Sequence, residues 1–219
     1  MQDRLAQLKK IIGKEGLDGL LISSRPNTFY YTGFTGTTSK CLVTRGNAYL
    51  VVDFRYTAQA KEQATAGIEV IELETDANDL LNKLCTGHRV ESLGIEGEDI
   101  TFSGYRSLRE SLKEVKAMKD VQASLGRVRI IKDSGEILLI QKAVDIADNA
   151  FQEVLAVIKP GVRECEVALE LEYKMKKMGA SGVSFETIVA SGPRSALPHG
   201  VAGIRQLQAG DAIVMDFGA

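Results

Sequence analysis

Two side chains near the end of the sequence, His199 and Asp216, have the type and setting for proton transfer and for metal binding. His199 lies in the segment SGPRSALPHG, between Pro198, which restricts the backbone, and Gly200, which frees it. Because an imidazole changes its charge near neutral pH, it can donate or accept a proton during a reaction. Asp216 follows the apolar run AIVM, and a carboxylate at the end of a buried strand needs a cation, a metal ion or several hydrogen-bond donors.

Each of these residues also has a purely structural interpretation. Asp216 could cap a turn at Gly218, and His199 could be an exposed loop residue. A Ser-His-Asp triad that uses Ser191 or Ser195 is a further alternative, which the absence of a GxSxG nucleophile elbow disfavours. The residue pattern alone therefore leaves the catalytic and the structural interpretations open.

Alternating strands and helices precede these residues, which predicts an α/β layer domain in the first half of the chain. The pattern predicts helices at 3–15, 54–64, 76–85 and 105–115, and strands at 19–23, 68–73 and 92–96. Residues 41–53 are predicted to form a hairpin around Gly46-Asn47, a pair suited to positive φ. Arg25-Pro26-Asn27 is predicted to end the strand at 19–23.

The second half of the chain has longer helical patterns. Residues 116–131 are rich in charge and lack a clean period, which predicts a junction between domains 1–125 and 126–219. Asp133 and Glu136 have capping-box spacing, so a helix should follow, with an apolar stripe that runs from Ile137 to Ile158. Further elements are then predicted in order: a helix at 163–178, a strand at 184–190 and a strand at 211–218.

The composition limits the function classes that need consideration. The 219 residues contain 27 Lys+Arg and 29 Asp+Glu, and the formal charge of -2 is not gathered into blocks, so neither nucleic acid nor a membrane surface is a predicted partner. Three widely separated cysteines fit neither a disulfide framework nor paired zinc ligands. With no signal-peptide pattern at its start and no apolar span, the sequence predicts a cytoplasmic protein that acts on small molecules or peptides.

The order and spacing of several segments resemble the pita-bread metallopeptidases, in the branch of Xaa-Pro dipeptidase (prolidase) and aminopeptidase P. In the second half the matching segments are RIIK with Glu136-Ile137, IKPGVRECEVALELE, SFETIVASGPRSALPHG and RQLQAGDAIVMDFGA. In the first half, GLDGLLISSRPNTFYYTGFTG and YLVVDFRYTAQA resemble a creatinase-type N-terminal domain. The resemblance implies an α/β creatinase-like domain, a mixed sheet with flanking helices, over residues 1–125. The first part of an α+β pita-bread fold should follow over residues 126–219.

The resemblance also implies a site with two divalent metal ions, manganese, cobalt or zinc, held by two aspartates, one histidine and two glutamates. Asp216 matches the first aspartate, and the other four ligands have no counterpart in the 219 residues. His199 matches a histidine that contacts substrate and stabilises the tetrahedral intermediate. The implied function is hydrolysis of the peptide bond that precedes proline. This chain is then expected to be an incomplete and inactive portion of such an enzyme, one that binds no metal by itself.

Three questions stay open at this stage. The implied activity is either that of a dipeptidase or that of an aminopeptidase. A relative that kept the fold and lost the site would be a non-catalytic binding or assembly protein instead. The resemblance also implies a homodimer, and the aromatic group Phe29, Tyr30, Tyr31 and Phe34 could serve either at its interface or in the core.

Overall fold

The computed structural model describes residues 3–219 and divides into two compact units. Unit 1 ends at Ile131 and unit 2 begins at Lys132. The contacts therefore divide later than the predicted junction after residue 125. The reason is that residues 122–130 form a helix that packs within unit 1.

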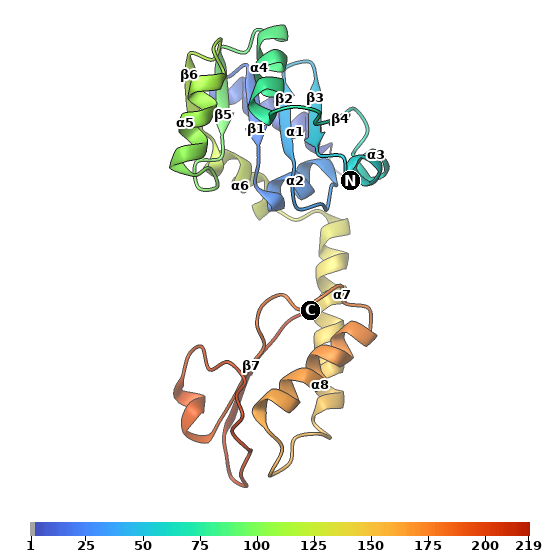
Figure 1. Ribbon diagram of the computed structural model, residues 1–219. Coiled ribbons are helices and arrows are strands. Elements are labelled where there is room, and N and C mark those ends of the chain that lie inside the picture. Colours follow the sequence, from blue (N-terminus) through green and yellow to red (C-terminus); the bar gives the residue numbers. More distant parts are fainter. Residues whose placement is uncertain (1–2) are drawn as a thin grey trace. The chain divides into compact units, whose positions relative to one another are not determined.

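Unit 1 contains a six-stranded mixed sheet (Figure 1). Its strands are β1 (Gly19–Ile22), β2 (Lys40–Thr44), β3 (Ala48–Val52), β4 (Glu69–Glu72), β5 (Ser92–Ile95) and β6 (Ala117–Asp120). Their order across the sheet is β4-β3-β2-β1-β5-β6. The pairs β1–β2 and β2–β3 are antiparallel, whereas β3–β4, β1–β5 and β5–β6 are parallel.

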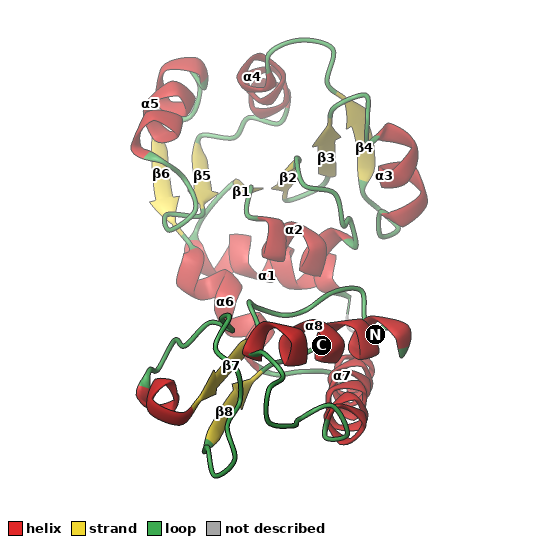
Figure 2. Ribbon diagram, turned by 60° about the horizontal axis from the view of Figure 1, so that its bottom comes forward, coloured by secondary structure: helices red, strands yellow, loops and turns green. Residues whose placement is uncertain are grey.

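Helices cover both faces of this sheet (Figure 2). They are α1 (Arg4–Glu15), α2 (Arg25–Thr32), α3 (Thr57–Gln63), α4 (Ala77–Gly87), α5 (Phe102–Ser111) and α6 (Gln122–Ile130). Successive strand residues point to opposite faces. Leu21 therefore packs in the core beneath α4 and α5, while Leu20 and Ile22 pack in the core beneath α1, α2 and α6.

Local sequence signals account for several of these boundaries. The side chain of Asp3 caps α1, and Gly16 ends it with a φ of 68°. The predicted hairpin forms between β2 and β3, but neither Gly46 nor Asn47 adopts the expected positive φ. Instead, Thr44 N donates to Asn47 O at 2.8 Å and Asn47 N donates to Thr44 Oγ1 at 3.0 Å.

Three elements of unit 1, α2, β6 and α6, differ from the sequence-based prediction. The first strand ends before Arg25-Pro26-Asn27, as predicted, but this segment starts a helix that was not predicted, because Ser24 Oγ caps α2 and Pro26 lies in its first turn. β6 is a largely exposed edge strand, and Leu125 is the one buried residue of α6. Neither segment therefore has an apolar period that a sequence pattern could reveal.

Unit 2 contains two helices and a two-stranded antiparallel sheet, joined by a loop that begins with a short 3-10 helix (Figure 1). The elements are α7 (Ser134–Val154), α8 (Glu164–Lys177), β7 (Ile188–Ser191), the 3-10 helix η1 (Gly192–Ala196) and β8 (Ile213–Asp216). α8 packs against both α7 and β7. The core joins Leu171 and Met175 of α8 to Val189 of β7.

The predicted capping box starts α7, because Glu136 N donates to Asp133 Oδ1 at 2.9 Å and Asp133 N donates to Glu136 Oε2 at 2.8 Å. Only the second half of the predicted apolar stripe is covered, since Ile137, Ile140 and Val144 are 55%, 50% and 46% exposed. None of the helices in residues 3–219 has both the length and the apolar character needed to cross a membrane.

Candidate active site

The structure places His199 and Asp216 near one level of the unit 2 sheet. Asp216 is the last residue of β8 and lies opposite Ile188 of β7. On its other side, Ile188 forms an antiparallel bridge with Val201, two residues after His199. Adjacent strands lie about 4.8 Å apart, so roughly two strand spacings separate the backbones of Val201 and Asp216. The fold thus brings both predicted residues to the same end of β7.

Both side chains are exposed, which corrects the expectation of a buried carboxylate at Asp216. β8 is covered on one face only, because Ile213 and Met215 pack in the core while Val214 is 44% exposed. An exposed carboxylate keeps its hydration and needs no compensating charge. The case for Asp216 as a metal ligand therefore depends on its position and not on burial.

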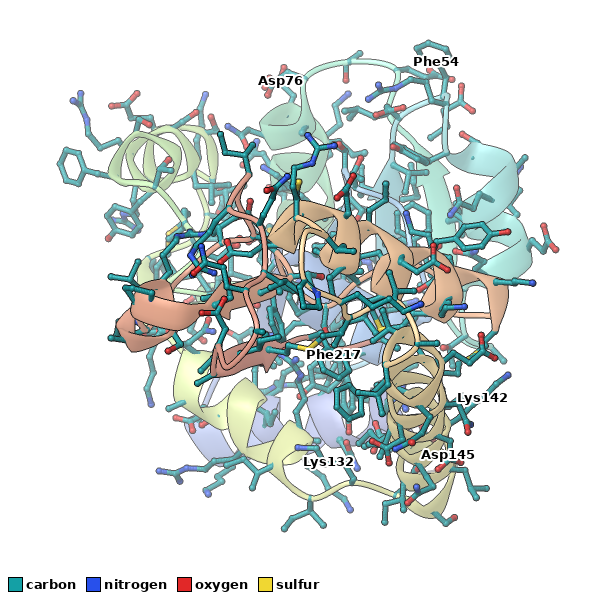
Figure 3. All side chains as sticks on the ribbon, turned by 90° about the horizontal axis from the view of Figure 1, so that it is seen from below. Phe54, Asp76, Lys132, Lys142, Asp145 and Phe217 are labelled. Carbon is teal, nitrogen blue, oxygen red and sulfur yellow. The ribbon has the colours of Figure 1, made fainter. Side chains whose placement is uncertain are left out.

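The chain on either side of Asp216 is anchored in unit 2. Met215 packs against the core of that unit. The ring of Phe217 stacks on Phe151 of α7, with ring centroids 5.8 Å apart and an angle of 18° between the ring planes (Figure 3). Since alternate residues of a strand point to opposite faces, these contacts fix the exposed face as the one to which Asp216 belongs.

Asp216 forms no metal site with other side chains of residues 3–219. Within that range, no group of three or more His, Cys, Asp or Glu side chains is arranged to hold a metal ion. A divalent ion is held when several donors close on it together. The residues described here therefore do not fit the dinuclear centre that the resemblance implies, and Asp216 can supply only one of its ligands.

A buried carboxylate, Glu164, fastens the loop in which His199 lies. Glu164 is the first residue of α8 and is 0% exposed. Its Oε1 accepts hydrogen bonds from Ser191 N at 2.8 Å and from Ser191 Oγ at 2.7 Å, and its Oε2 accepts one from Gly203 N at 3.1 Å. Arg194 Nη1 pairs with Oε2, and Arg194 Nη2 donates to Val201 O at 2.8 Å. Glu164 and Arg194 thus tie Ser191 and η1 to Val201 and Gly203, which follow His199 in the loop.

A second ion pair fixes the approach to β8. Arg205 donates to both carboxylate oxygens of Asp211, at 2.6 Å from Nη1 and 3.2 Å from Nη2. Asp211 also accepts a hydrogen bond from Gln208 N at 2.8 Å. The hydrogen bond from Arg205 holds the pKa of Asp211 below its ordinary value. Because Arg205 Nη1 also donates to Ser191 Oγ, the two ion pairs meet at Ser191.

These contacts give the two serines of the triad alternative structural partners. Ser191 Oγ donates to Glu164 and accepts from Arg205, while Ser195 Oγ donates to Gly192 O at 2.7 Å. Neither bond involves His199, so the structure gives no support to a serine nucleophile. Sequence reasoning missed Glu164 because an acidic residue at the start of a helix is usually an exposed stabiliser of the helix dipole.

Comparison with known proteins decides the family. The profile of the creatinase/prolidase N-terminal domain matches residues 4–131, which is more than half of the chain. The chain belongs to the creatinase/prolidase family. Metallopeptidase family M24 matches residues 139–219, so the creatinase-type unit precedes an M24 segment, as the sequence resemblance predicted.

Similar proteins cover nearly all of this creatinase/prolidase chain. The uncharacterized peptidase YqhT of Bacillus subtilis is 39% identical over 99% of the chain and 61% of its own length. The Xaa-Pro dipeptidase from Bacillus anthracis has a TM-score of 0.93 at 36% identity, over 99% of this chain and 60% of its own. The X-Pro aminopeptidase from Thermotoga maritima has a TM-score of 0.89 at 37% identity, over 97% and 60%.

The chain thus spans about 60% of the length of these relatives. The predicted fold class is confirmed: unit 1 is a mixed sheet with flanking helices, and the structural relatives of the chain are pita-bread prolidases.

Proposed function

We propose that this chain supplies the N-terminal unit and the first part of the catalytic unit of a metal-dependent peptidase that hydrolyses the bond preceding proline. The observation that supports the proposal is that Asp216 and Val201, two residues after His199, both pair with Ile188 within a creatinase/prolidase fold. The similarity to proteins named Xaa-Pro dipeptidase and X-Pro aminopeptidase supports the substrate class and leaves both kinds of specificity open.

Each of the two residues has one role in this proposal. Asp216 is a single metal ligand, and its exposed carboxylate at a strand end is accessible to donors from other segments. Oxygen-rich sites of this kind accept manganese, cobalt or zinc. His199 lies in a loop that Glu164 and Arg194 hold in place, so its imidazole can donate a hydrogen bond to the oxyanion of a tetrahedral intermediate.

The 219 residues are expected to be inactive by themselves, because one carboxylate does not retain two ions. We place the protein in the cytoplasm and propose that it forms a homodimer. Within the aromatic group considered for the interface, Tyr31 and Phe34 are 0% exposed and belong to the core. Phe29, 53% exposed, remains a candidate for a subunit contact.

A second candidate function is that of a non-catalytic binding or assembly protein of the same fold. An assay of the protein encoded by the complete gene separates the two candidates. With added manganese, the peptidase proposal predicts hydrolysis of Leu-Pro and no comparable hydrolysis of Leu-Ala, while the 219-residue chain cleaves neither. A complete gene product that binds no metal and cleaves neither dipeptide would reject the peptidase proposal.

A further inference from the structure

A cavity of about 260 Å³ lies in unit 1 at the carboxyl ends of the parallel strands β1 and β5. Leu21 and Ile95 line it from these strands, and Ser23 and Glu96 line it just beyond the strand ends. The chain leaves β1 toward β2 on one side, whereas β5 lies on the other, so the strand order reverses at this point. Open α/β sheets bind ligands in the crevice at such a reversal.

A cation, Lys40, lines the cavity from the start of β2, and its Nζ lies 3.4 Å from Asn78 Oδ1. Within residues 3–219 Lys40 forms no ion pair. Burial lowers the pKa of Lys40, and the nearby carboxylate of Asp76 partly offsets this shift. An ammonium in such a place gains from an anionic partner.

Two helix N-termini also border the cavity. Asn78 belongs to the first turn of α4 and Gly104 to the first turn of α5, and both residues line the cavity. Their amides are already bonded, because Asn78 N donates to Asp76 Oδ1 at 2.8 Å and Gly104 N donates to Thr101 Oγ1 at 3.1 Å. The ammonium of Lys40 is therefore the group that would hold a ligand carboxylate.

Two carboxylates, of Glu96 and Asp99, also line the cavity. Glu96 is 1% exposed and its carboxylate is already occupied, because it accepts from Ser23 N, Ser24 N, Ser24 Oγ and Asn27 Nδ2 at 2.5 to 2.8 Å. Asp99 is exposed and accepts a hydrogen bond from Ser23 Oγ at 2.9 Å. Since a carboxylate has about four acceptor positions, Asp99 has capacity for a ligand ammonium.

Apolar side chains line the rest of the cavity. The cavity is bounded there by Leu21, Ile95, Ile100 and Leu108. Its volume lies just below the roughly 300–1,000 Å³ of pockets for drug-sized ligands, so the fitting ligand is a small molecule with an apolar body.

We propose that this cavity binds a zwitterionic α-amino acid with an apolar side chain, its carboxylate on Lys40 and its ammonium on Asp99. The site lies in unit 1 and uses neither His199 nor Asp216, so it goes beyond the proposed peptidase function. Its test does not require an active enzyme.

The test is a ¹H–¹⁵N NMR titration of the 219-residue chain with L-leucine, N-acetyl-L-leucine and L-leucinamide. The acetyl derivative lacks the ammonium and the amide lacks the carboxylate. L-leucine should shift the amide signals of Gly104 and Ser107 saturably. Each analogue should bind at least about tenfold more weakly than L-leucine, because each lacks one charge-assisted hydrogen bond. The absence of a saturable shift at these amides, or equal affinity for all three probes, would overturn the proposal.

Substitutions test the roles of Lys40 and Asp99 separately. Lys40→Met and Asp99→Asn should each weaken L-leucine binding at least about tenfold. Lys83→Met on α4 and Glu98→Gln, both at exposed positions outside the cavity lining, should leave it unchanged. If Lys40→Met does not give a folded spectrum, Asp99→Asn decides, since its side chain lies at the surface. Unaltered L-leucine affinity in Asp99→Asn would refute the assignment.

Discussion

Replacement of Arg194 by methionine should destabilise the β7–β8 sheet far more than the same change at Arg163. Arg194 pairs with Glu164, which is 0% exposed, so its loss leaves a buried carboxylate with neutral donors only. Removal of one partner from a buried pair costs about 3–5 kcal/mol. Because three donors remain on Glu164, we expect the lower end, about 3 kcal/mol. The Arg163–Glu166 pair is 49% and 45% exposed, and such surface pairs contribute about 0.2–1 kcal/mol.

Hydrogen exchange of the β7 backbone amides measures this difference. A loss of about 3 kcal/mol corresponds to exchange that is roughly a hundredfold faster. Arg163→Met should accelerate exchange by less than about fivefold. The double variant Glu164→Gln/Arg194→Met should recover part of the protection, because it removes the buried charge together with its partner. Equal acceleration in the two single variants, or no recovery in the double variant, would refute the reasoning.

Three further predictions follow from the described contacts. Gly33→Ala should lower the thermal stability of unit 1 by at least about 1 kcal/mol, because φ is 79° and a Cβ would lie 2.8 Å from a backbone oxygen. Gly13→Ala, in open space within α1, should instead raise the stability by about 0.5–1 kcal/mol. If both variants shifted the stability in the same direction, this reasoning would be contradicted. In urea unfolding, Glu96→Gln should lower the free energy of unfolding by about 1–3 kcal/mol, because an amide group would face buried donors. Glu98→Gln, at an exposed position, should change the free energy of unfolding by less than about 0.5 kcal/mol. Similar changes in the two variants would be evidence against the buried network around Glu96. Asp211 has a depressed pKa, so its contribution to folding stability is present above the ordinary pKa of 3.8 and is lost as the pH falls through the lower folded-state pKa. The melting temperatures of the wild type and of Asp211→Asn should therefore converge at that low pH. A difference in melting temperature that does not change with pH would count against the ion pair.

Features fixed by neighbouring residues were predictable from the sequence. The end of α1 at Gly16 and the capping box at Asp133 and Glu136 follow from a few adjacent residues. Apart from α2, β6 and α6, the order of strands and helices in unit 1 followed from apolar periodicity. α2 was missed because Pro26 was interpreted only as the end of a strand, although Ser24, two residues earlier, supplies the cap of a helix.

Features that depend on distant contacts were not predictable. Glu164 is buried because Ser191, Arg194 and Gly203 surround it, at separations of 27 to 39 residues. The burial expected for Asp216 was wrong because AIVM was taken as buried throughout, whereas β8 is covered on one face only. The positions of His199 and Asp216 in a strand-loop-strand segment were predicted. Only the structure shows that Asp216 and Val201, two residues after His199, both pair with Ile188.

The most direct test of the proposed site is the kcat/KM for Leu-Pro of the protein that the complete gene encodes, with and without Asp216→Asn. Removal of a group that only supports metal ligands costs about 10–100-fold in activity, so loss of a ligand should cost at least about 100-fold. The matched variant Asp148→Asn, at an exposed position on α7, should keep the wild-type value. An Asp216→Asn protein that cleaves Leu-Pro at the wild-type rate would contradict the account.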